Sequence, residues 1–122
     1  MSLEIERKRK EISTIDSQKI MLPVRDALDV LSGKWKIPII ISLFYGNKRF
    51  KEIIRDIPKL TDKSLAKELK ELESNMLITR TVLNSFPPQV EYSITEHGCT
   101  LCRVITELQQ WGVLHREKII DK

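Results

Sequence analysis

Hydrophobic residues recur at helical spacing in two consecutive segments near the middle of the chain. The first apolar stripe runs through residues 50–57. Pro58 predicts the end of that helix, because proline has no amide hydrogen and disfavours helix in the residue before it. Thr61 is a good N-cap for a second helix. The buried stripe of this second helix consists of Leu65, Leu69 and Leu72. The pattern therefore predicts two short helices joined by a tight turn.

The residues before this pair also follow helical patterns. Pro23 can open a helix, and the pair Ser32-Gly33 predicts its end. The apolar face of this helix consists of Val24, Ala27, Leu28 and Leu31. Residues 35–44 are apolar nearly all round, which predicts a central buried helix. Pro38 fits without loss if that helix begins near residue 35 or later, because the first amides of a helix lack internal partners.

After the helix pair the apolar period changes from that of a helix to that of a strand. Residues 77–83 and residues 89–94 each alternate apolar and polar side chains, so they predict two strands of a hairpin. The connecting residues 84–88 include two prolines, which stiffen the loop. Thr95 is expected to cap a long final helix that Gly112 bends or ends. One face of that helix carries Leu101, Ile105, Leu108 and Trp111.

The chain has 122 residues, of which 41% are hydrophobic, which fits one packed domain. We expect residues 1–20 to form a charged N-terminal extension, helical or flexible, and residues 21–122 to form the domain. No apolar run approaches the roughly 20 residues that span a bilayer, so no membrane partner is expected. The N-terminus lacks an apolar signal region, and two cysteines make no secreted disulfide framework, so the cytoplasm is the expected location.

Basic charge is concentrated on the predicted helix pair. Residues 47–70 contain eight basic and four acidic side chains, an excess equal to the +4 of the whole chain. Lys63, Lys67 and Lys70 stand one turn apart on the second helix, away from its leucines. A local positive face suits the phosphate backbone of DNA, although lysines at this spacing also occur on ordinary solvated helices. A basic helix after a turn is how helix-turn-helix proteins enter a major groove.

Five motifs in a fixed order now suggest a family. They are Pro23-Val24 with Ala27-Leu28, Gly33-Lys34-Trp35, Lys48-Arg49-Phe50 with Glu52-Ile53, residues 65–73 (LAKELKELE) and residues 87–98 (PPQVEYSITEHG). In these motifs the chain resembles the HxlR-type winged helix-turn-helix transcription regulators, a group related to the MarR type. The resemblance implies a mainly α (α+β) fold, with a two-stranded wing and extra N- and C-terminal helices that pair two subunits.

A homodimer of this type implies double-stranded, pseudo-palindromic operator DNA as the partner. The recognition helix is expected at residues 62–74 and the wing at residues 77–94. An unknown small-molecule effector is possible in such a regulator, whereas no cofactor and no metal are expected. The expected dimer interface consists of Val24, Leu28, Leu31, Leu101, Leu108 and Trp111.

The strongest candidates for the groove lie at the start of the recognition helix. Lysine reaches guanine O6 or N7 and serine contacts several bases, although both also bind phosphate. Thr61 can hold a phosphate or serve only as the cap. Residues at other helix starts are candidate phosphate contacts or ordinary surface charge. The expected DNA-binding set is Lys34, Lys48, Arg49, Thr61, Lys63, Ser64, Lys67, Lys70 and Gln89.

Two positions depart from the family pattern. Many members have a cysteine just before the Pro-Val pair, in some a sensor of oxidants or electrophiles, where this chain has Leu22. Leucine has no thiolate to oxidise, so that N-terminal switch is not expected here. The second departure is Gln89, where a basic residue often follows the two prolines. Glutamine still donates hydrogen bonds but lacks charge, so a weaker grip of the wing on DNA is expected.

The pair Cys99 and Cys102 has two interpretations. Core packing is the favoured one, because cysteine is among the most buried residue types. A thiol pair near a helix start is the alternative, whereas a metal site lacks a second pair of ligands. No nucleophile, acid pair or phosphate loop supports catalysis, and Glu71 and Glu73 are interpreted as solvated charge. Besides the DNA-binding regulator, two alternatives remain: a protein-interaction winged helix and a thiol-responsive regulator.

Overall fold

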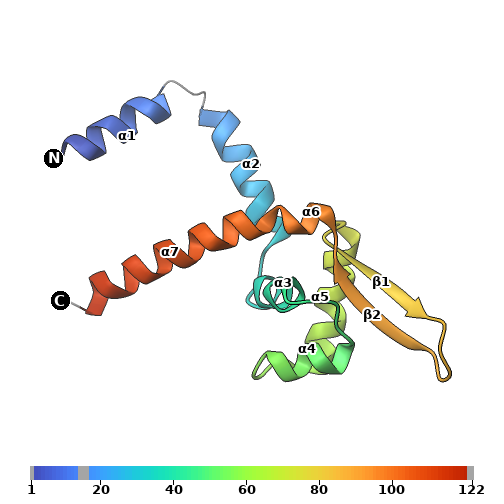
Figure 1. Cartoon of the computed structure of the whole chain (residues 1–122). Helices are drawn as coiled ribbons and strands as arrows, with labels where there is room; N and C mark the ends of the chain where they lie inside the picture. Colours follow the sequence, from blue (N-terminus) through green and yellow to red (C-terminus); the bar gives the residue numbers. More distant parts are fainter. Residues whose placement is uncertain (1, 14–16, 121–122) are drawn as a thin grey trace. The chain divides into compact units, whose positions relative to one another are not determined.

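The chain divides into two compact units between Ser32 and Gly33 in a computed structural model, which describes residues 2–13 and 17–120. The first unit holds α1 (Leu3–Ser13) and α2 (Ser17–Val30). The second unit holds α3 (Lys36–Phe44), α4 (Phe50–Asp56), α5 (Asp62–Ser74), β1 (Ile78–Leu83), β2 (Gln89–Ile94), α6 (Glu96–Cys99) and α7 (Leu101–Ile120) (Figure 1).

The start of α2 differs from the sequence prediction. The helix begins at Ser17, so Pro23 lies inside it rather than at its first position. An internal proline removes one hydrogen bond of the helix, and the remaining turns of this 14-residue helix continue on both sides. Much of the charged N-terminal extension is helical as α1, and its expected boundary after residue 20 falls within α2. The part of that extension at residues 14–16 lies outside the described residues.

The predicted central helix is α3. It begins after Trp35, whose carbonyl oxygen accepts from the Ile39 amide at 3.0 Å, so Pro38 occupies the first turn as required. Ile39, Ile40 and Leu43 are buried. Ile41 is exposed, so the expectation that this helix is covered nearly all round was wrong for one side.

The helix-turn-helix is formed by α4 and α5 around a shared core. Ile57 and Leu60, in the turn between them, are buried, and the stripe Leu65, Leu69 and Leu72 of α5 is buried as predicted. Helix α4 packs against both α3 and α5, so it lies in the same core as these two helices. The fully buried large side chains are Ile39, Ile40, Leu43, Ile53, Leu65, Leu72 and Ile78.

The predicted hairpin is present with the expected five-residue loop. Strands β1 and β2 are antiparallel, and their register runs from Ile78 opposite Ile94 to Leu83 opposite Gln89. A backbone bridge joins the hairpin to the segment before α4: Lys48 N–H donates to Tyr92 O at 2.9 Å, and Tyr92 N–H donates to Lys48 O at 2.8 Å. The middle of strand β2 is thus hydrogen-bonded to the segment that leads into α4.

The predicted final helix is divided at Thr100 into α6 and α7. The Thr95 hydroxyl accepts from the Gly98 amide at 2.9 Å, which confirms the expected cap. A side chain at Gly98 has no room, because a Cβ there would lie 2.2 Å from Leu77 O. Gly112 neither ends the helix nor interrupts it, since α7 continues to Ile120.

Candidate nucleic-acid interface

The two sides of α5 differ sharply in chemistry. Its leucine stripe faces the core, whereas Lys63, Lys67 and Lys70 are exposed. The exposed lysines stand on one side because residues three or four apart lie one turn from each other. The helix therefore offers a row of positive charge to solvent while its apolar side fixes its position in the domain.

The start of α5 is held by local hydrogen bonding. The Thr61 hydroxyl accepts from the Ser64 amide at 3.1 Å, so Thr61 acts as the N-cap. Ser64 is half-buried, between the exposed Lys63 and the core residue Leu65. This geometry supports the capping interpretation of Thr61 and leaves its expected phosphate contact a prediction.

A buried ion pair that the sequence did not predict links α3 to the inner side of α5. Lys36 and Glu68 are both buried, with Lys36 Nζ 3.2 Å from Glu68 Oε1, and Lys36 also pairs with Glu71. Glu71, interpreted as solvated charge, is partly exposed but pairs with Lys36, a partner that the interpretation did not include. Burial by itself lowers the pKa of Lys36, but hydrogen bonds to Glu71 and Glu68 outweigh burial and raise it above its ordinary value. The hydrogen bond from Lys36 lowers the pKa of Glu71.

One signal in the sequence pointed toward this ion pair. Glu68 lies at helical spacing within the stripe of Leu65, Leu69 and Leu72, so a carboxylate occupies the buried side of α5. A buried carboxylate requires a partner, and a lysine next to the central apolar helix was available. The partner's identity did not follow from spacing, because Lys36 is 32 positions away.

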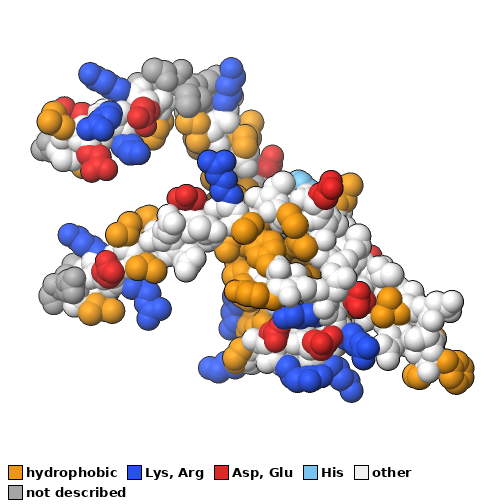
Figure 2. All heavy atoms as spheres, in the orientation of Figure 1, with side chains coloured by type: hydrophobic (Ala, Val, Ile, Leu, Met, Phe, Trp, Pro, Cys, Tyr) orange, Lys and Arg blue, Asp and Glu red, His pale blue; other side chains and the backbone are white. Residues whose placement is uncertain are grey.

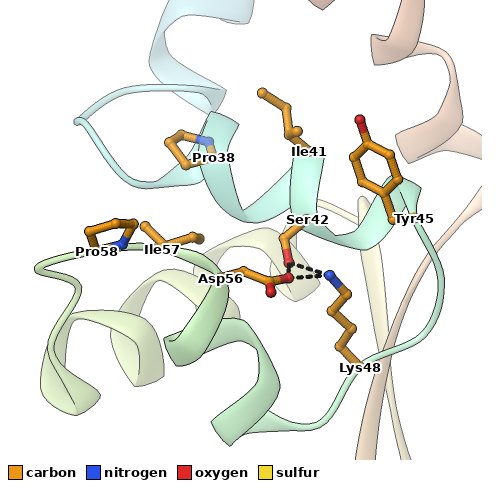
Figure 3. A pocket seen from close by; sticks show the side chains of 8 residues that line it. All are labelled: Pro38, Ile41, Ser42, Tyr45, Lys48, Asp56, Ile57 and Pro58. Carbon is orange, nitrogen blue, oxygen red and sulfur yellow. Dashed lines mark hydrogen bonds and ion pairs between the residues drawn. The ribbon is translucent and has the colours of Figure 1, made fainter.

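Lys48, an expected phosphate contact, is engaged inside the domain. Its ammonium pairs with Asp56 and donates to Ser42 Oγ at 3.1 Å, while the Ser42 hydroxyl donates to Asp56 Oδ2 at 2.7 Å (Figure 3). The hydrogen bond from Lys48 is the main cause that lowers the pKa of Asp56. These groups line a hollow of about 530 Å³ together with Pro38, Ile41, Tyr45, Ile57 and Pro58. A phosphate would have to compete with Asp56 for this lysine.

Further basic side chains gather over α4. Figure 2 shows lysine and arginine side chains concentrated at this part of the molecule. Arg49, an expected contact, is exposed at the start of α4, where its amide donates to Glu52 Oε1 at 2.8 Å. Lys34 is exposed too, and its ammonium lies 4.8 Å from the centre of the Trp35 ring. The exposed basic residues of this region that were not named as contacts are Lys51, Arg55 and Lys59.

The wing contributes little charge. Gln89 is half-buried at the start of β2, opposite Leu83, and Arg80 is exposed on β1. A hollow of about 160 Å³ lies between the wing and α5, with Arg80 and Lys70 in its lining. The positive charge of the candidate interface is thus supplied mainly by the helices.

Cys99 and Cys102 are free and exposed, so the expectation of core packing was wrong. The reason is their position: in α6 only Gly98 is buried, and α7 has no buried residue. Among the described residues, no group of three or more histidine, cysteine or acidic side chains is placed to hold a metal ion.

The expected dimer-interface residues lie on surfaces that are open in the single chain. Trp111 is 63% exposed and its ring stacks on His115, with the ring centres 4.9 Å apart. Val24, Leu28 and Leu108 are exposed, whereas Leu31 and Leu101 are half-buried. Their role in pairing two subunits stays a prediction.

A basic second helix (α5), a first helix (α4) that packs on the central helix α3, and a hairpin bridged to the segment before α4 define a winged helix-turn-helix DNA-binding domain. The family model described as HxlR-like helix-turn-helix matches residues 30–119. The chain belongs to this family, and it is a transcriptional regulator rather than an enzyme. None of the helices in residues 2–13 and 17–120 has the length and apolar character needed to cross a membrane.

Relatives and solved structures agree with this assignment. The chain is 42% identical to the HTH-type transcriptional regulator YdeP of Bacillus subtilis over 97 residues, which cover 80% of this chain and 76% of that protein. It is similar to the reduced form of the regulator YodB from B. subtilis, with 42% identity, a TM-score of 0.69, and coverage of 74% and 88%. The redox regulator HypR in its reduced form gives 38% identity, a TM-score of 0.75, and coverage of 82% and 99%.

Proposed function

We propose that this regulator binds a pseudo-palindromic operator as a homodimer, with α5 in the major groove and the wing on the backbone or the neighbouring minor groove. The observation that carries the proposal is the exposed row Lys63, Lys67 and Lys70 opposite a fully buried leucine stripe. Such a helix is rigidly placed and positively charged toward solvent. Ser64 adds a hydroxyl in the first turn of α5, and the N-terminal residues of a recognition helix are those that contact base edges.

The exposed apolar side chains of α2, in the first unit, and those of α7, in the second, each supply surface for pairing with a second copy. A single chain leaves Leu28, Leu108 and Trp111 open to water, and apolar surface of this kind favours burial against a second copy. A two-fold dimer presents two recognition helices, and these match half-sites one helical turn apart or a multiple of it.

The direct test is selection of bound sequences from random duplex DNA, repeated at several salt concentrations. We expect an inverted repeat, and a log–log dependence of affinity on salt that steepens by roughly 0.9 for each phosphate neutralised. Lys67→Ala should relax preference at one base pair by about 1–3 kcal/mol, or weaken all sequences equally if it touches phosphate. Lys118→Ala, which removes an exposed charge near the end of α7, is the matched control and should keep the wild-type affinity. Failure to bind any duplex would favour a protein-interaction winged helix instead.

A second function, response to thiol-reactive compounds, is favoured by the exposure of Cys99 and Cys102. Its support from related proteins is that YodB has been solved in reduced, diamide-treated and quinone-bound forms, and HypR in reduced and oxidised forms. A thiolate that adds to a quinone forms a C–S bond at the expense of a ring C=C π bond, and the displaced electron pair moves to a ring oxygen, which takes up a proton. The product is a bulky hydroquinone thioether on the α6–α7 segment. Alkylation with iodoacetamide should then change operator affinity in the wild type and not in the double variant Cys99→Ser/Cys102→Ser. Unchanged affinity after complete alkylation would remove this function.

A further inference from the structure

The tip of the wing carries an aromatic side chain that contacts little of the protein. Phe86 is 101% exposed, in the five-residue loop between β1 and β2. The loop around it is ordered by two hydrogen bonds: Ser85 N–H donates to Leu83 O at 2.9 Å, and the Ser85 hydroxyl donates to Pro87 O at 2.9 Å. Figure 2 shows hydrophobic side chains gathered at this end of the hairpin. A phenyl ring is therefore held away from the domain on a structured loop.

The same tip has no charge with which to hold a phosphate. Residues 81–90 contain no lysine, arginine, aspartate or glutamate. Val82, which lies on β1 close to the loop, is also exposed. The helices therefore supply the positive charge, and the outer half of the wing offers apolar surface together with the neutral donors Asn84 and Gln89.

The hairpin has the reach for the groove next to α5. Six strand residues extend it by about 20 Å, since a strand rises roughly 3.3 Å per residue. Half a turn of B-DNA, the offset between a major groove and the adjacent minor groove, is about 17 Å. The direction of the hairpin is fixed by packing of β1 on α5 and by the bridge between Lys48 and Tyr92.

We propose that Phe86 is an apolar wedge that enters the minor groove beside α5 and partly unstacks one base step. This inference rests on the proposed DNA binding. Inserted apolar side chains of minor-groove proteins act in this way and kink the duplex. Pyrimidine–purine steps deform most easily, so the wedge selects such a step at a fixed distance from the bases that α5 contacts. The neutral donors beside the ring fit the adenine N3 and thymine O2 acceptors of that groove.

Operator DNA is the occupant that these observations favour over a protein. The wing lies in the same compact unit as the basic α5 and α4, and charge on those helices brings the tip to a duplex. An aromatic side chain buried against a base pair gains stacking contacts that do not depend on charge. The wedge therefore adds affinity and specificity without adding salt dependence.

The test uses the full-length protein and the operator obtained by selection from random DNA. Phe86→Ala should lower operator affinity about five- to a hundredfold for each half-site, from the range of aromatic–base stacking energies, with the salt slope unchanged. Duplex bending, measured by energy transfer between the DNA ends, should decrease. 2-Aminopurine placed at the preferred step is brighter when it is unstacked. Its fluorescence should therefore be lower in the complex with Phe86→Ala than in the complex with the wild type, and close to that of the free duplex. Phe86→Trp should retain bending and affinity.

Two controls make the result specific. Val82→Ala removes exposed apolar surface from the same hairpin and should leave bending unchanged. Phe86→Arg should replace the wedge by a phosphate contact, which lowers bending and steepens the salt slope by about 0.9 for each half-site. Melting temperatures of the Phe86 variants should match the wild type, because the ring is fully exposed in the fold.

The proposal is overturned if Phe86→Ala binds and bends the operator as the wild type does, while the wild type binds DNA normally. It is also overturned if Phe86→Ala changes the oligomeric state and leaves bending intact, since the ring would then be a protein contact. Failure of the wild type to bind any duplex would instead contradict the proposed function.

Discussion

Three lysines of this chain have different surroundings, and those surroundings decide what each can do. Lys36 is buried against Glu68 and Glu71, where its charge holds α5 to α3. Lys48 is paired with Asp56 at the edge of a hollow. Lys67 is exposed on α5, where we propose that it contacts DNA. Burial and pairing, which depend on tertiary contacts, thus distinguish the first two lysines from the third.

Removal of Lys36 should destabilise the fold strongly. Lys36→Met keeps most of the side-chain volume but leaves Glu68 buried without its partner, a change that costs about 3–5 kcal/mol. Denaturant unfolding measures this loss. Lys34→Met, at an exposed position two residues earlier, should change stability by less than about 0.5 kcal/mol. The double variant Lys36→Met/Glu68→Leu should recover most of the loss, and an equal loss in all three variants would contradict the ion-pair explanation.

Acid should weaken the fold through two carboxylates. Hydrogen bonds from Lys48 and Lys36 hold the pKa values of Asp56 and Glu71 below their ordinary values. A lowered pKa in the folded state adds stability that is present above the ordinary pKa, about 4, and is lost as pH falls through the folded value. The free energy of unfolding should therefore fall below about pH 4. Asp56→Asn should make this fall shallower, whereas Asp26→Asn, at an exposed position of α2, should keep the wild-type slope.

At the scale of elements, glycines in the last two helices have opposite constraints. Gly98 of α6 lies against Leu77 O, and an added Cβ would meet that oxygen at 2.2 Å. Gly112 lies inside α7, where an added Cβ would meet no atom within 4 Å apart from its chain neighbours and the backbone of its own helix. The first glycine is required by packing between α6 and the base of the wing. The second glycine has no such packing role and lowers the stability of the helix through its conformational freedom.

Alanine substitutions should separate these two cases. Gly112→Ala should stabilise the protein by about 0.5–1 kcal/mol, because alanine favours a helix interior over glycine by that amount. Gly98→Ala should lower stability, since the helix must move away from the strand. Thermal unfolding of both variants checks this pair of expectations. A stabilising effect at Gly98 would show that the close approach is absent in solution.

The elements that could be predicted from the sequence are those fixed by local patterns. Strand β2 has the predicted bounds, and β1 begins one residue later than predicted, because alternation and a proline-containing loop define a hairpin locally. The leucine spacing of α5 also predicted which lysines are exposed. The predicted start of α2 was wrong. Pro23 was interpreted as the first residue of this helix, but it lies in the middle of it.

The rest of the site depends on contacts that spacing does not reveal. The pairing of Lys36 with Glu68 joins residues 32 positions apart, and composition cannot tell a buried lysine from a solvated one. Cys99 and Cys102 are exposed because α6 buries Gly98 alone and α7 buries no residue. The burial of residues on such a helix cannot be predicted from its own sequence, because most of its apolar side chains are exposed in the single chain.

At the scale of the whole molecule, DNA binding and self-association should be linked. Trp111→Asp places a charge on the exposed apolar side of α7 and should shift the protein from dimer to monomer in sedimentation equilibrium. Operator affinity should fall with it, because a monomer binds only one half-site. Val113→Asp makes the same change at an exposed valine two positions on, which projects from another side of the helix, and should leave the dimer intact. Loss of the dimer in both variants would contradict a specific interface.

The paired amides of Lys48 and Tyr92 have one more consequence. Two segments separated by the recognition helix share a closed ring of hydrogen bonds, so neither amide hydrogen can exchange with solvent unless both segments part. Their deuterium uptake should follow one common opening rate, and a duplex that clamps the hairpin should slow exchange at Lys48 as much as at Tyr92.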